Sequence, residues 1–306
     1  MKFEGKGGIS AEIICDSLGS EPLRGQKRDR LTTMVIRYPR FILGEVNTHR
    51  ALSKNSASSR AIPVSKMLAR VMEDPALPVF WGLNKSGMQA NEEASPEIIA
   101  KAIKLILDHS LKCIDLAEAL NDLGLHKQIV NRYTEPFHFM ETIITGTEWG
   151  NFFNLRSHKD AQPEFQELAF TMLKAYALSE PTFKFIHLPF GDRYLDENLS
   201  KLSLVKISVA RCARVSYLNF NGFVEHEKDY ALYDMLLKSG HMSPFEHVAY
   251  AGKPGEPVGN LVGWCSHRKT LPNENRSKID ILSLYRDAGR KIPEEILSLP
   301  LDRLAL

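Results

Sequence analysis

The sequence has few cysteines and no long apolar run. Its four cysteines lie far apart, and no two are separated by only two residues; they are Cys15, Cys113, Cys212 and Cys265. This spacing argues against a zinc site and against a disulfide scaffold, so we expect reduced cysteines that mostly pack in the interior. No stretch approaches the roughly 20 apolar residues of a membrane span, and the first residues lack the apolar segment of a secretion signal. We therefore expect a cytoplasmic protein with no membrane partner.

An excess of charge of either sign is also missing. Lys and Arg number 39 against 37 for Asp and Glu, which gives a net charge of +2. This balance provides no general attraction to nucleic acid or to a membrane surface. A basic run between Arg24 and Arg40 is most simply a solvated face, with binding of an anionic substrate as the alternative.

Several common nucleotide and metal motifs are absent as well. The sequence contains neither a Walker loop nor a G-x-G-x-x-G loop, which disfavours nucleotide sites of those kinds. Four histidines without metal-ligand spacing are interpreted as structural, and no metal is expected; they are His109, His126, His138 and His187.

Periodicity predicts two amphipathic helices, over residues 95–123 and 160–178. Ser95 is a suitable N-cap before Pro96, and Gly124 ends the first helix. Strands are predicted where β-branched and aromatic residues gather, at residues 32–36, 143–145, 204–209 and 247–250. Their irregular alternation favours an α+β (mixed α/β) fold. The polar segment 189–199 suggests a boundary between a lobe of residues 1–190 and a second lobe of residues 191–306.

An internal repeat relates residues 39–55 to residues 257–273. Each copy has a proline, nine residues, a His-Arg pair, four residues and an asparagine. The first copy continues as THRALSKNSASSR, residues 48–60, which is rich in hydroxyls and ends in an arginine. Serine hydroxyls and an arginine fork suit a phosphate group. The plainer interpretation is a polar helix end followed by a serine-rich loop.

Three stretches resemble the flavin-dependent thymidylate synthase family. The first matches its Arg-His-Arg, seven residues, Ser signature, except that Thr48 stands at the first arginine and Ser56 at a usual glutamate. The second, residues 151–165, resembles the Leu-Arg, turn, Ala-Gln-x-Glu pattern. The third contains Ala213 to Ser216 (ARVS) and Gly240 to His247 (GHMSPFEH). In this chain the third stretch follows the other two, whereas in the family it precedes them; duplication of the front half would produce this internal half-repeat.

The resemblance implies roles for individual residues. Arg156 would be catalytic, stabilising negative charge on the uracil ring, although a surface Arg–Glu pair is the alternative for this residue. Substrate would be bound by Ser58, Ser59, Arg60 and Arg156. FAD would be bound by His49, Arg50, Asn55, Asn151, Ser243, Glu246, His267, Arg268, Asn273 and Glu274. We expect the cluster of Arg156 with the Ser58 loop and the cluster around Glu246 to meet in space.

The resemblance also implies a reaction. The enzyme would convert dUMP to dTMP with FAD as cofactor and with NADPH and methylenetetrahydrofolate as co-substrates. It would be a homo-oligomer, a tetramer or a dimer, with active sites at subunit interfaces. A second nucleotide arginine of the family is missing between Tyr133 and Leu155, so either Arg132 or Arg276 would replace it, or the substrate differs from dUMP. Two alternatives follow: a flavin enzyme that makes another 5-modified pyrimidine nucleotide, or a degenerate homologue that binds nucleotide without catalysis.

Overall fold

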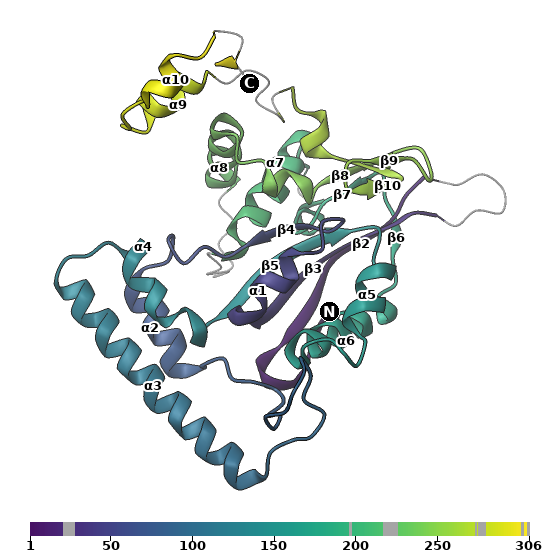
Figure 1. Cartoon of the computed structure of the whole chain (residues 1–306). Coiled ribbons are helices and arrows are strands. Elements are labelled where there is room, and N and C mark those ends of the chain that lie inside the picture. The colour runs from purple at the N-terminus through teal and green to yellow at the C-terminus, as the bar shows by residue number, and fades with distance from the viewer. Residues whose placement is uncertain are drawn as a thin grey trace.

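A six-stranded sheet is the centre of the computed structural model. The structure describes residues 1–20, 28–195, 198–216, 226–272, 274, 280–300 and 303–304. The sheet has the order β1-β2-β3-β5-β4, and β6 pairs in parallel with β2, whereas the other pairs are antiparallel (Figure 1). The strands are β1 (Lys2–Glu4), β2 (Ser10–Leu18), β3 (Arg30–Pro39), β4 (Ser53–Ser56), β5 (Phe139–Gly146) and β6 (Thr182–Phe183).

Helices α5 (Gly150–Arg156) and α6 (Pro163–Leu178) cover one face of this sheet. Side chains alternate between the two faces of a strand, so Met34 and Ile36 of β3 point the same way. Both pack with Leu168 and Met172 of α6 in the largest buried cluster. The apolar stripe of α6 therefore faces the core, as its periodicity predicts.

The C-terminal part of the chain packs on the other face of the sheet. It contains α7 (Lys201–Ala213), α8 (His226–Ser239), β7 (Ile186–His187), β8 (Ala249–Ala251) and β11 (Trp264–Ser266). Thr33 on the second face of β3 bonds to Thr145 and to His187, with O–O and O–N separations of 2.7 Å. Four short helical turns and a small hairpin complete this part: η4 (Gly191–Tyr194), η5 (Arg214–Ser216), η6 (Ser243–Glu246), η7 (His267–Thr270), β9 (Pro257–Val258) and β10 (Leu261–Val262).

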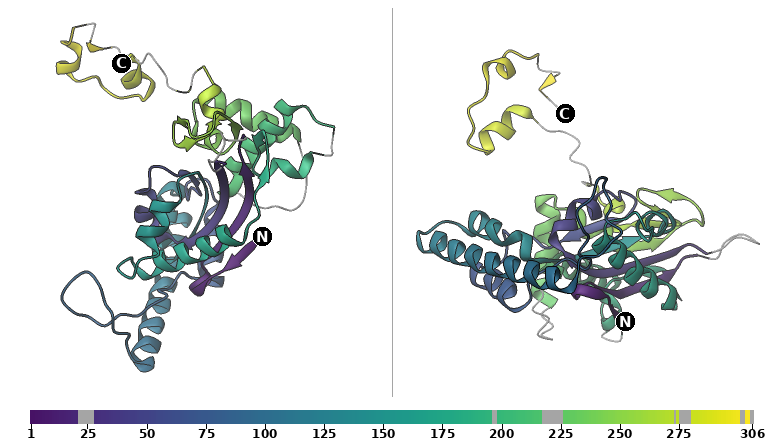
Figure 2. Two further views of the ribbon diagram at one scale, coloured as in Figure 1. Left: turned by 90° about the vertical axis from the view of Figure 1, so that its right-hand side faces the viewer. Right: turned by 60° about the horizontal axis from the view of Figure 1, so that its bottom comes forward.

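A helical layer extends from the β4 side of the sheet. It consists of α2 (Val64–Glu73), α3 (Pro96–Asp122), α4 (Lys127–Val130) and η3 (Asn131–Phe137), which share a buried cluster of their own. Figure 2 shows α3 at the edge of the molecule, and α9 (Ile281–Asp287) with α10 (Glu294–Leu297) away from the sheet. The remaining elements are η1 (Lys6–Gly8), η2 (Arg40–Ile42) and α1 (Leu43–Asn47).

Most predicted elements are confirmed. The mixed α+β class is correct, and α3 begins after Ser95, whose side chain accepts a hydrogen bond from the Ile98 amide. The strands predicted at 32–36 and 143–145 lie inside β3 and β5. The fourth predicted strand starts two residues late, at Ala249, because the turn η6 precedes it.

The strand predicted at residues 204–209 is wrong. This segment lies inside α7, which begins after Ser200, whose side chain accepts a hydrogen bond from the Ser203 amide. The helix is buried on most sides, including Val205, Ile207 and Val209. An almost fully buried helix shows no polar face, so its β-branched residues imitate a buried strand.

The two copies of the sequence repeat form different elements. Residues 43–47 are the helix α1, whereas the corresponding residues 261–265 lie in β10 and β11. The repeat therefore has no counterpart in local structure. The division into two lobes stays a prediction.

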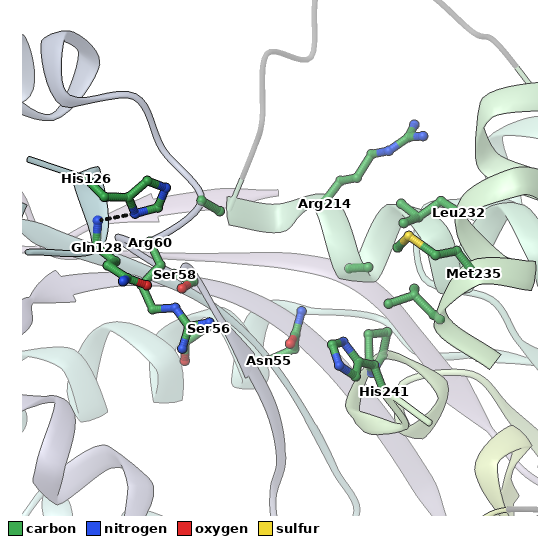
Figure 3. Close-up of a pocket in the computed structure, with 14 residues that line it drawn as sticks. Asn55, Ser56, Ser58, Arg60, His126, Gln128, Arg214, Leu232, Met235 and His241 are labelled. Carbon is green, nitrogen blue, oxygen red and sulfur yellow. Dashed lines mark hydrogen bonds between the residues drawn. The ribbon is translucent and has the colours of Figure 1, made fainter. Parts of the chain in front are cut away.

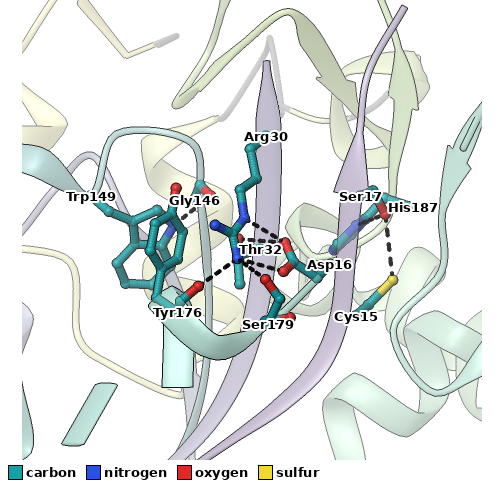
Figure 4. A network of polar contacts seen from close by, with 10 residues as sticks. All are labelled: Cys15, Asp16, Ser17, Arg30, Thr32, Gly146, Trp149, Tyr176, Ser179 and His187. Atoms are coloured by element: carbon teal, nitrogen blue, oxygen red, sulfur yellow. Dashed lines mark hydrogen bonds and ion pairs between the residues drawn. The ribbon is translucent and has the colours of Figure 1, made fainter. Parts of the chain in front are cut away.

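The basic run is not simply a solvated face. Arg24 and Lys27 lie outside the described residues. Arg30, with 19% of its side chain exposed, binds the Asp16 carboxylate with nitrogen–oxygen distances of 2.6 and 3.0 Å. Its guanidinium also lies 3.7 Å from the Tyr176 ring centre (Figure 4). Arg30 therefore ties β2 and β3 to α6.

Replacing Asp16 by alanine is expected to lower the free energy of unfolding by about 3 kcal/mol, because removal of one partner leaves the half-buried Arg30 without its carboxylate. Urea titration measures the change. The matched control is Asp234→Ala, which breaks the Lys206–Asp234 pair, where Asp234 is 60% exposed; it should cost under about 1 kcal/mol. Equal losses in both variants would contradict this role for Arg30.

Three expectations about absent features can be compared with the described residues. The four cysteines are free; Cys15 and Cys212 are buried, whereas Cys113 and Cys265 are partly exposed. In the part of the chain that the structure describes, no group of three or more His, Cys, Asp or Glu residues could hold a metal ion. Within the same residues, no helix has the length and apolar character needed to cross a membrane.

Candidate functional site

A cavity of about 730 Å³ opens between β4 and the C-terminal elements. The chain segments around it are β4 and its following loop, the start of α4, the end of α7 with η5, the helix α8, and η6. Figure 3 shows these side chains around the cavity. Its lining is Asn55, Ser56, Ser58, Arg60, Ala61, His126, Gln128, Ala213, Arg214, Leu232, Met235, Leu236, His241 and Pro244.

One end of the cavity is rich in hydrogen-bond donors. Ser58 and Arg60 follow β4 and are exposed, and His126 and Gln128 face them from the start of α4 (Figure 3). Among the described residues, no carboxylate forms an ion pair with Arg60. A guanidinium with no carboxylate partner, beside a hydroxyl and an amide, suits a phosphate.

Hydrogen bonds to η3 hold the loop that carries Ser58 and Arg60. Ser59 is 4% exposed and donates a 2.9 Å hydrogen bond to Glu135, while its carbonyl accepts one of 2.7 Å from the Asn131 side chain. Asn131 also binds the Ile62 carbonyl at 3.0 Å. Ser59, a predicted substrate residue, thus holds the loop in this structure and does not line the cavity.

The other end of the cavity is apolar. Leu232, Met235 and Leu236 of α8 form this wall, with Ala213 at the end of α7 and Pro244 in η6. A surface of aliphatic side chains suits the face of a planar ring, whereas the donors at the opposite end suit an anion. The cavity can therefore accept a molecule with an aromatic ring at one end and a phosphate at the other.

The first and third motifs meet beside this cavity. Ser243 of η6 donates a 2.9 Å hydrogen bond to the Lys54 carbonyl in β4 and lies 3.5 Å from the Asn55 side-chain oxygen. Asn55 in turn donates to the Cys212 carbonyl at 3.0 Å. The cluster around Ser58 and the segment that carries Glu246 are therefore brought together within one chain.

Glu246 lies in a network of opposite charges. Arg268 binds it at 2.5 Å and approaches Glu274 at 3.8 Å. Lys269 also binds Glu274 at 3.0 Å. Three predicted flavin residues are thus adjacent, but their charges are directed at one another. Asn273, predicted to join them, lies outside the described residues.

His267 is buried beneath that network. Its Nε2 bonds to the Tyr233 hydroxyl at 2.8 Å, and its Nδ1 bonds to Tyr250 and to Thr270 at 3.0 and 3.1 Å. Burial lowers the pKa of His267 to about 4, so the ring is neutral at neutral pH. In this structure both ring nitrogens are engaged inside the protein.

Arg156, the predicted catalytic residue, lies at the other end of β4. Its Nε donates a 2.8 Å hydrogen bond to His49, and Nη2 donates one of 3.2 Å to Thr48. The guanidinium lies 4.6 Å from the Phe165 ring centre. Burial, and secondarily the charges of Arg156 and Lys54, lowers the pKa of His49 to about 4, and a neutral His49 can accept the bond from Arg156.

The alternative of an Arg156–Glu164 surface pair does not describe this arrangement. The two Glu164 oxygens instead accept hydrogen bonds from the Val79 amide, at 3.0 Å, and the Gln162 side chain, at 3.2 Å. The expected meeting of Arg156 with the Ser58 loop is not seen in one chain. Arg156 binds His49 at the N-terminal end of β4, whereas Ser58 lies beyond the C-terminal end of this strand. Arg50 and Asn151 are exposed near this end.

Sequence reasoning missed several cavity residues. Arg214 lies in the ARVS motif and His241 in the GHMSPFEH motif, but the resemblance implies no role for either residue. Arg214 binds the buried Asp229 at 2.5 Å. His126 and Gln128 lie about seventy residues after the Ser58 loop, and no motif marks them. Two arginines were candidates to replace the missing nucleotide arginine of the family. Arg132 binds Glu135 at 2.9 Å and does not line the cavity, and Arg276 lies outside the described residues.

Comparisons with known proteins give partial matches. No protein-family model matches the chain. A flavin-dependent thymidylate synthase of Pseudothermotoga lettingae is 30% identical over 97 residues, which are 29% of this chain and 43% of that protein. One of Thermotoga neapolitana is 37% identical over 68 residues, or 22% and 31% of the two chains. The matches thus span less than half of the length of these relatives.

Among solved structures, a UMP/dUMP methylase, PolB from Streptomyces cacaoi with 5-bromo-UMP bound, aligns with a TM-score of 0.48 at 17% identity. This alignment covers 57% of this chain and 92% of that one. The sequence matches bear the same family name as the resemblance carried by the three motifs. The chain is therefore similar, over part of its length, to flavin-dependent thymidylate synthases.

Proposed function

We propose that this chain is an FAD-dependent enzyme that methylates dUMP to dTMP, with methylenetetrahydrofolate as the one-carbon donor and NADPH as the reductant. The observation that carries the proposal is the cavity itself. Two motifs far apart in the sequence, residues 48–60 and residues 240–247, supply Ser58, Arg60 and His241 to one lining. The partial sequence matches to flavin-dependent thymidylate synthases support the same reaction.

The donor end of the cavity is assigned to the nucleotide phosphate. Arg60 supplies a fixed positive charge and Ser58 a hydroxyl, and both are open to a ligand. Because the Ser59 and Asn131 hydrogen bonds fix the loop, little ordering is needed when the phosphate binds. Gln128 is placed to contact the same anion.

The residues present fit a flavin. The α8 wall of Leu232, Met235 and Leu236 suits a planar ring system, and Asn55 and His241 supply polar atoms beside it. When bound, FAD would supply the hydride for the reaction. The predicted flavin residues Ser243, Glu246, Arg268 and Glu274 adjoin this wall through η6 and β4. Arg268 would then exchange part of its pairing with Glu246 for contact with the cofactor.

Arg156 is proposed to act at a site completed by a second subunit. Its place at the opposite end of β4 from Ser58 keeps it out of the cavity of its own chain. His49 accepts the Nε hydrogen bond and so orients the guanidinium, which leaves other N–H groups for a ligand. A fixed cation there would stabilise negative charge on a pyrimidine ring. We propose a cytoplasmic homo-oligomer, a dimer or tetramer, on this basis.

Product analysis tests the reaction. Purified protein is incubated with FAD, NADPH, methylenetetrahydrofolate and dUMP, and the nucleotides are analysed by mass spectrometry. The proposal predicts dTMP, whose formation stops when the folate is omitted. Unchanged dUMP under complete conditions, with flavin bound, would contradict it.

Two other functions are each favoured by one observation. Thr48 stands where the family has an arginine, and this change in the Arg156 environment favours a related enzyme that makes another 5-modified pyrimidine nucleotide. A product of different mass in the same experiment would identify it. The mutual pairing of Glu246 and Arg268 favours a degenerate homologue that binds nucleotide without catalysis. Protein that binds dUMP but stays colourless with FAD would identify that one.

A further inference from the structure

The long helix α3 has two apolar faces. The inner face packs Ile114 and Ala117 into the buried cluster with α2 and η3. The outer face carries four large aliphatic residues with 44–77% of their surface exposed: Ile98, Leu105, Leu116 and Leu123. Figures 1 and 2 show α3 at the edge of the molecule. In a helix of 3.6 residues per turn, this second face is a straight stripe.

The outer stripe follows a heptad repeat without interruption. The residues along it are Ile98, Ala102, Leu105, His109, Lys112, Leu116, Ala119 and Leu123, spaced four, three, four, three, four, three and four apart. Alternating steps of four and three are the spacing of the a and d positions of a coiled coil. They cover the whole helix. A solvated helix has no need of this regularity, so the stripe indicates a helical partner.

The stripe is symmetric about its own midpoint. Consider two copies of α3 that lie antiparallel, with the midpoint of the contact between residues 110 and 111. Two residues then face each other across the contact when their numbers add up to 221. Ile98 then faces Leu123 of the second copy, and Leu105 faces its Leu116. The two small residues, Ala102 and Ala119, also face each other. Large side chains therefore meet large ones and small meet small along the whole contact.

The central polar pair fits the same alignment. His109 of one copy meets Lys112 of the other, whereas a parallel alignment would place Lys112 against Lys112 in the contact. Like charges opposed in this way are unfavourable, and a polar pair in an apolar seam fixes register. Within its own chain, the exposed His109 packs its ring edge-on against Phe137, and its Nε2 lies 3.7 Å from the Cys113 sulfur.

One pair of opposite charges beside the stripe favours the antiparallel alignment. Lys101 lies at one end of the helix and Asp122 at the other, both on the flank away from the inner apolar face. Antiparallel pairing brings Lys101 of each copy beside Asp122 of the other. Near the centre, the same flank brings Asp108 of each copy beside Asp115 of the other, and Lys112, which lies between these two positions in the sequence, supplies positive charge to both carboxylates. Opposite charges across the flanks of a coiled coil select orientation.

We propose that α3 is a self-association surface, on which two copies of this chain form an antiparallel pair of helices about a twofold axis. The occupant of the outer stripe is α3 of the second copy. The inference rests on the spacing, exposure and charges of this one helix and is independent of the proposed enzymatic function.

Directional cross-linking tests the pairing. In a full-length Cys113→Ser background, the double variant Ala102→Cys with Ala119→Cys places a thiol on each side of the antiparallel contact. Residues 102 and 119 of one chain are about 25 Å apart along the helix, so they cannot bond within a chain. After mild oxidation, we expect most of the double variant to migrate as a covalent dimer on a non-reducing gel. The two single variants should match the background.

Each other outcome overturns the proposal. Cross-linking of the single variants would indicate a parallel pair, and absence of cross-linking in the double variant would indicate another occupant, such as a different protein or the C-terminal helices. Sedimentation supplies a second readout that introduces no thiol. Leu105→Glu should weaken self-association at this surface by about 10-fold or more, because a large apolar side chain of the contact is replaced by a charge that pairing would bury. The exposed Leu111→Glu, which lies off the stripe, is the matched control and should associate like the wild type.

Discussion

Replacing Arg156 by alanine is expected to lower turnover of dUMP by about 10²- to 10³-fold while the protein keeps its flavin. The loss of a fixed donor to charge that develops on the ring has an effect of this size. Flavin retention is expected because the cavity between β4 and α8 contains no atom of Arg156. Steady-state kinetics and the visible spectrum of the same preparation measure the two effects.

A structural role for Arg156 must be separated from a chemical one. The side chain contacts His49, Thr48 and the Phe165 ring, so its removal also alters packing. Arg156→Lys keeps the positive charge but loses the fork that binds both neighbours. We expect the alanine variant to stay folded with a small loss of thermal stability, and the lysine variant to keep partial activity. Wild-type turnover in Arg156→Ala would remove this residue from the mechanism.

Replacing Arg60 by alanine is expected to raise the KM for dUMP by about 10- to 100-fold, because a charge-assisted bond to phosphate is lost. The change should be smaller for deoxyuridine, which has no phosphate. Initial rates over a range of each substrate measure this difference. Stability should not change, since Arg60 is exposed.

The control for this experiment is Arg290→Ala, which removes another exposed arginine, from the loop between α9 and α10. It should leave both constants unchanged. An Arg60→Ala variant with wild-type KM for dUMP would show that the donor end of the cavity does not hold the phosphate.

The sequence predicts local structure best where one physical signal dominates. Ser95, Pro96 and a regular apolar period specify α3, and β-branched residues specify β3 and β5. It fails at α7, where burial on most sides removes the polar face that distinguishes a helix. It also fails for Arg30, because no pattern reveals that a cation in a basic run binds Asp16 from the adjacent strand.

The sequence also predicts the candidate site only in part. The motifs predict the residue types near the cavity, and the contact of Ser243 with β4 brings two of those motifs together. They do not show that Arg156 lies with His49 at the far end of β4, since this depends on how α5 packs on the sheet. His126 and Gln128 reach the cavity only because α4 begins near the Ser58 loop, a contact between segments that are distant in the sequence.

Under the proposed function, the two ends of β4 would belong to two different parts of the site. β4 pairs with β5 over Ser53 to Ser56, and this pairing fixes the separation of its two ends. The Arg60 end faces the cavity with α8 of the same chain, and the Arg156 end is directed away from it. An assembly that placed the second end against another subunit's cavity would complete the site.

The visible absorption spectrum of the purified protein, before and after addition of FAD and then dUMP, tests the central claim most directly. The account predicts the absorption bands of a bound flavin, which remain after gel filtration and shift when dUMP enters the cavity. Colourless protein that retains no flavin after incubation with FAD would contradict it.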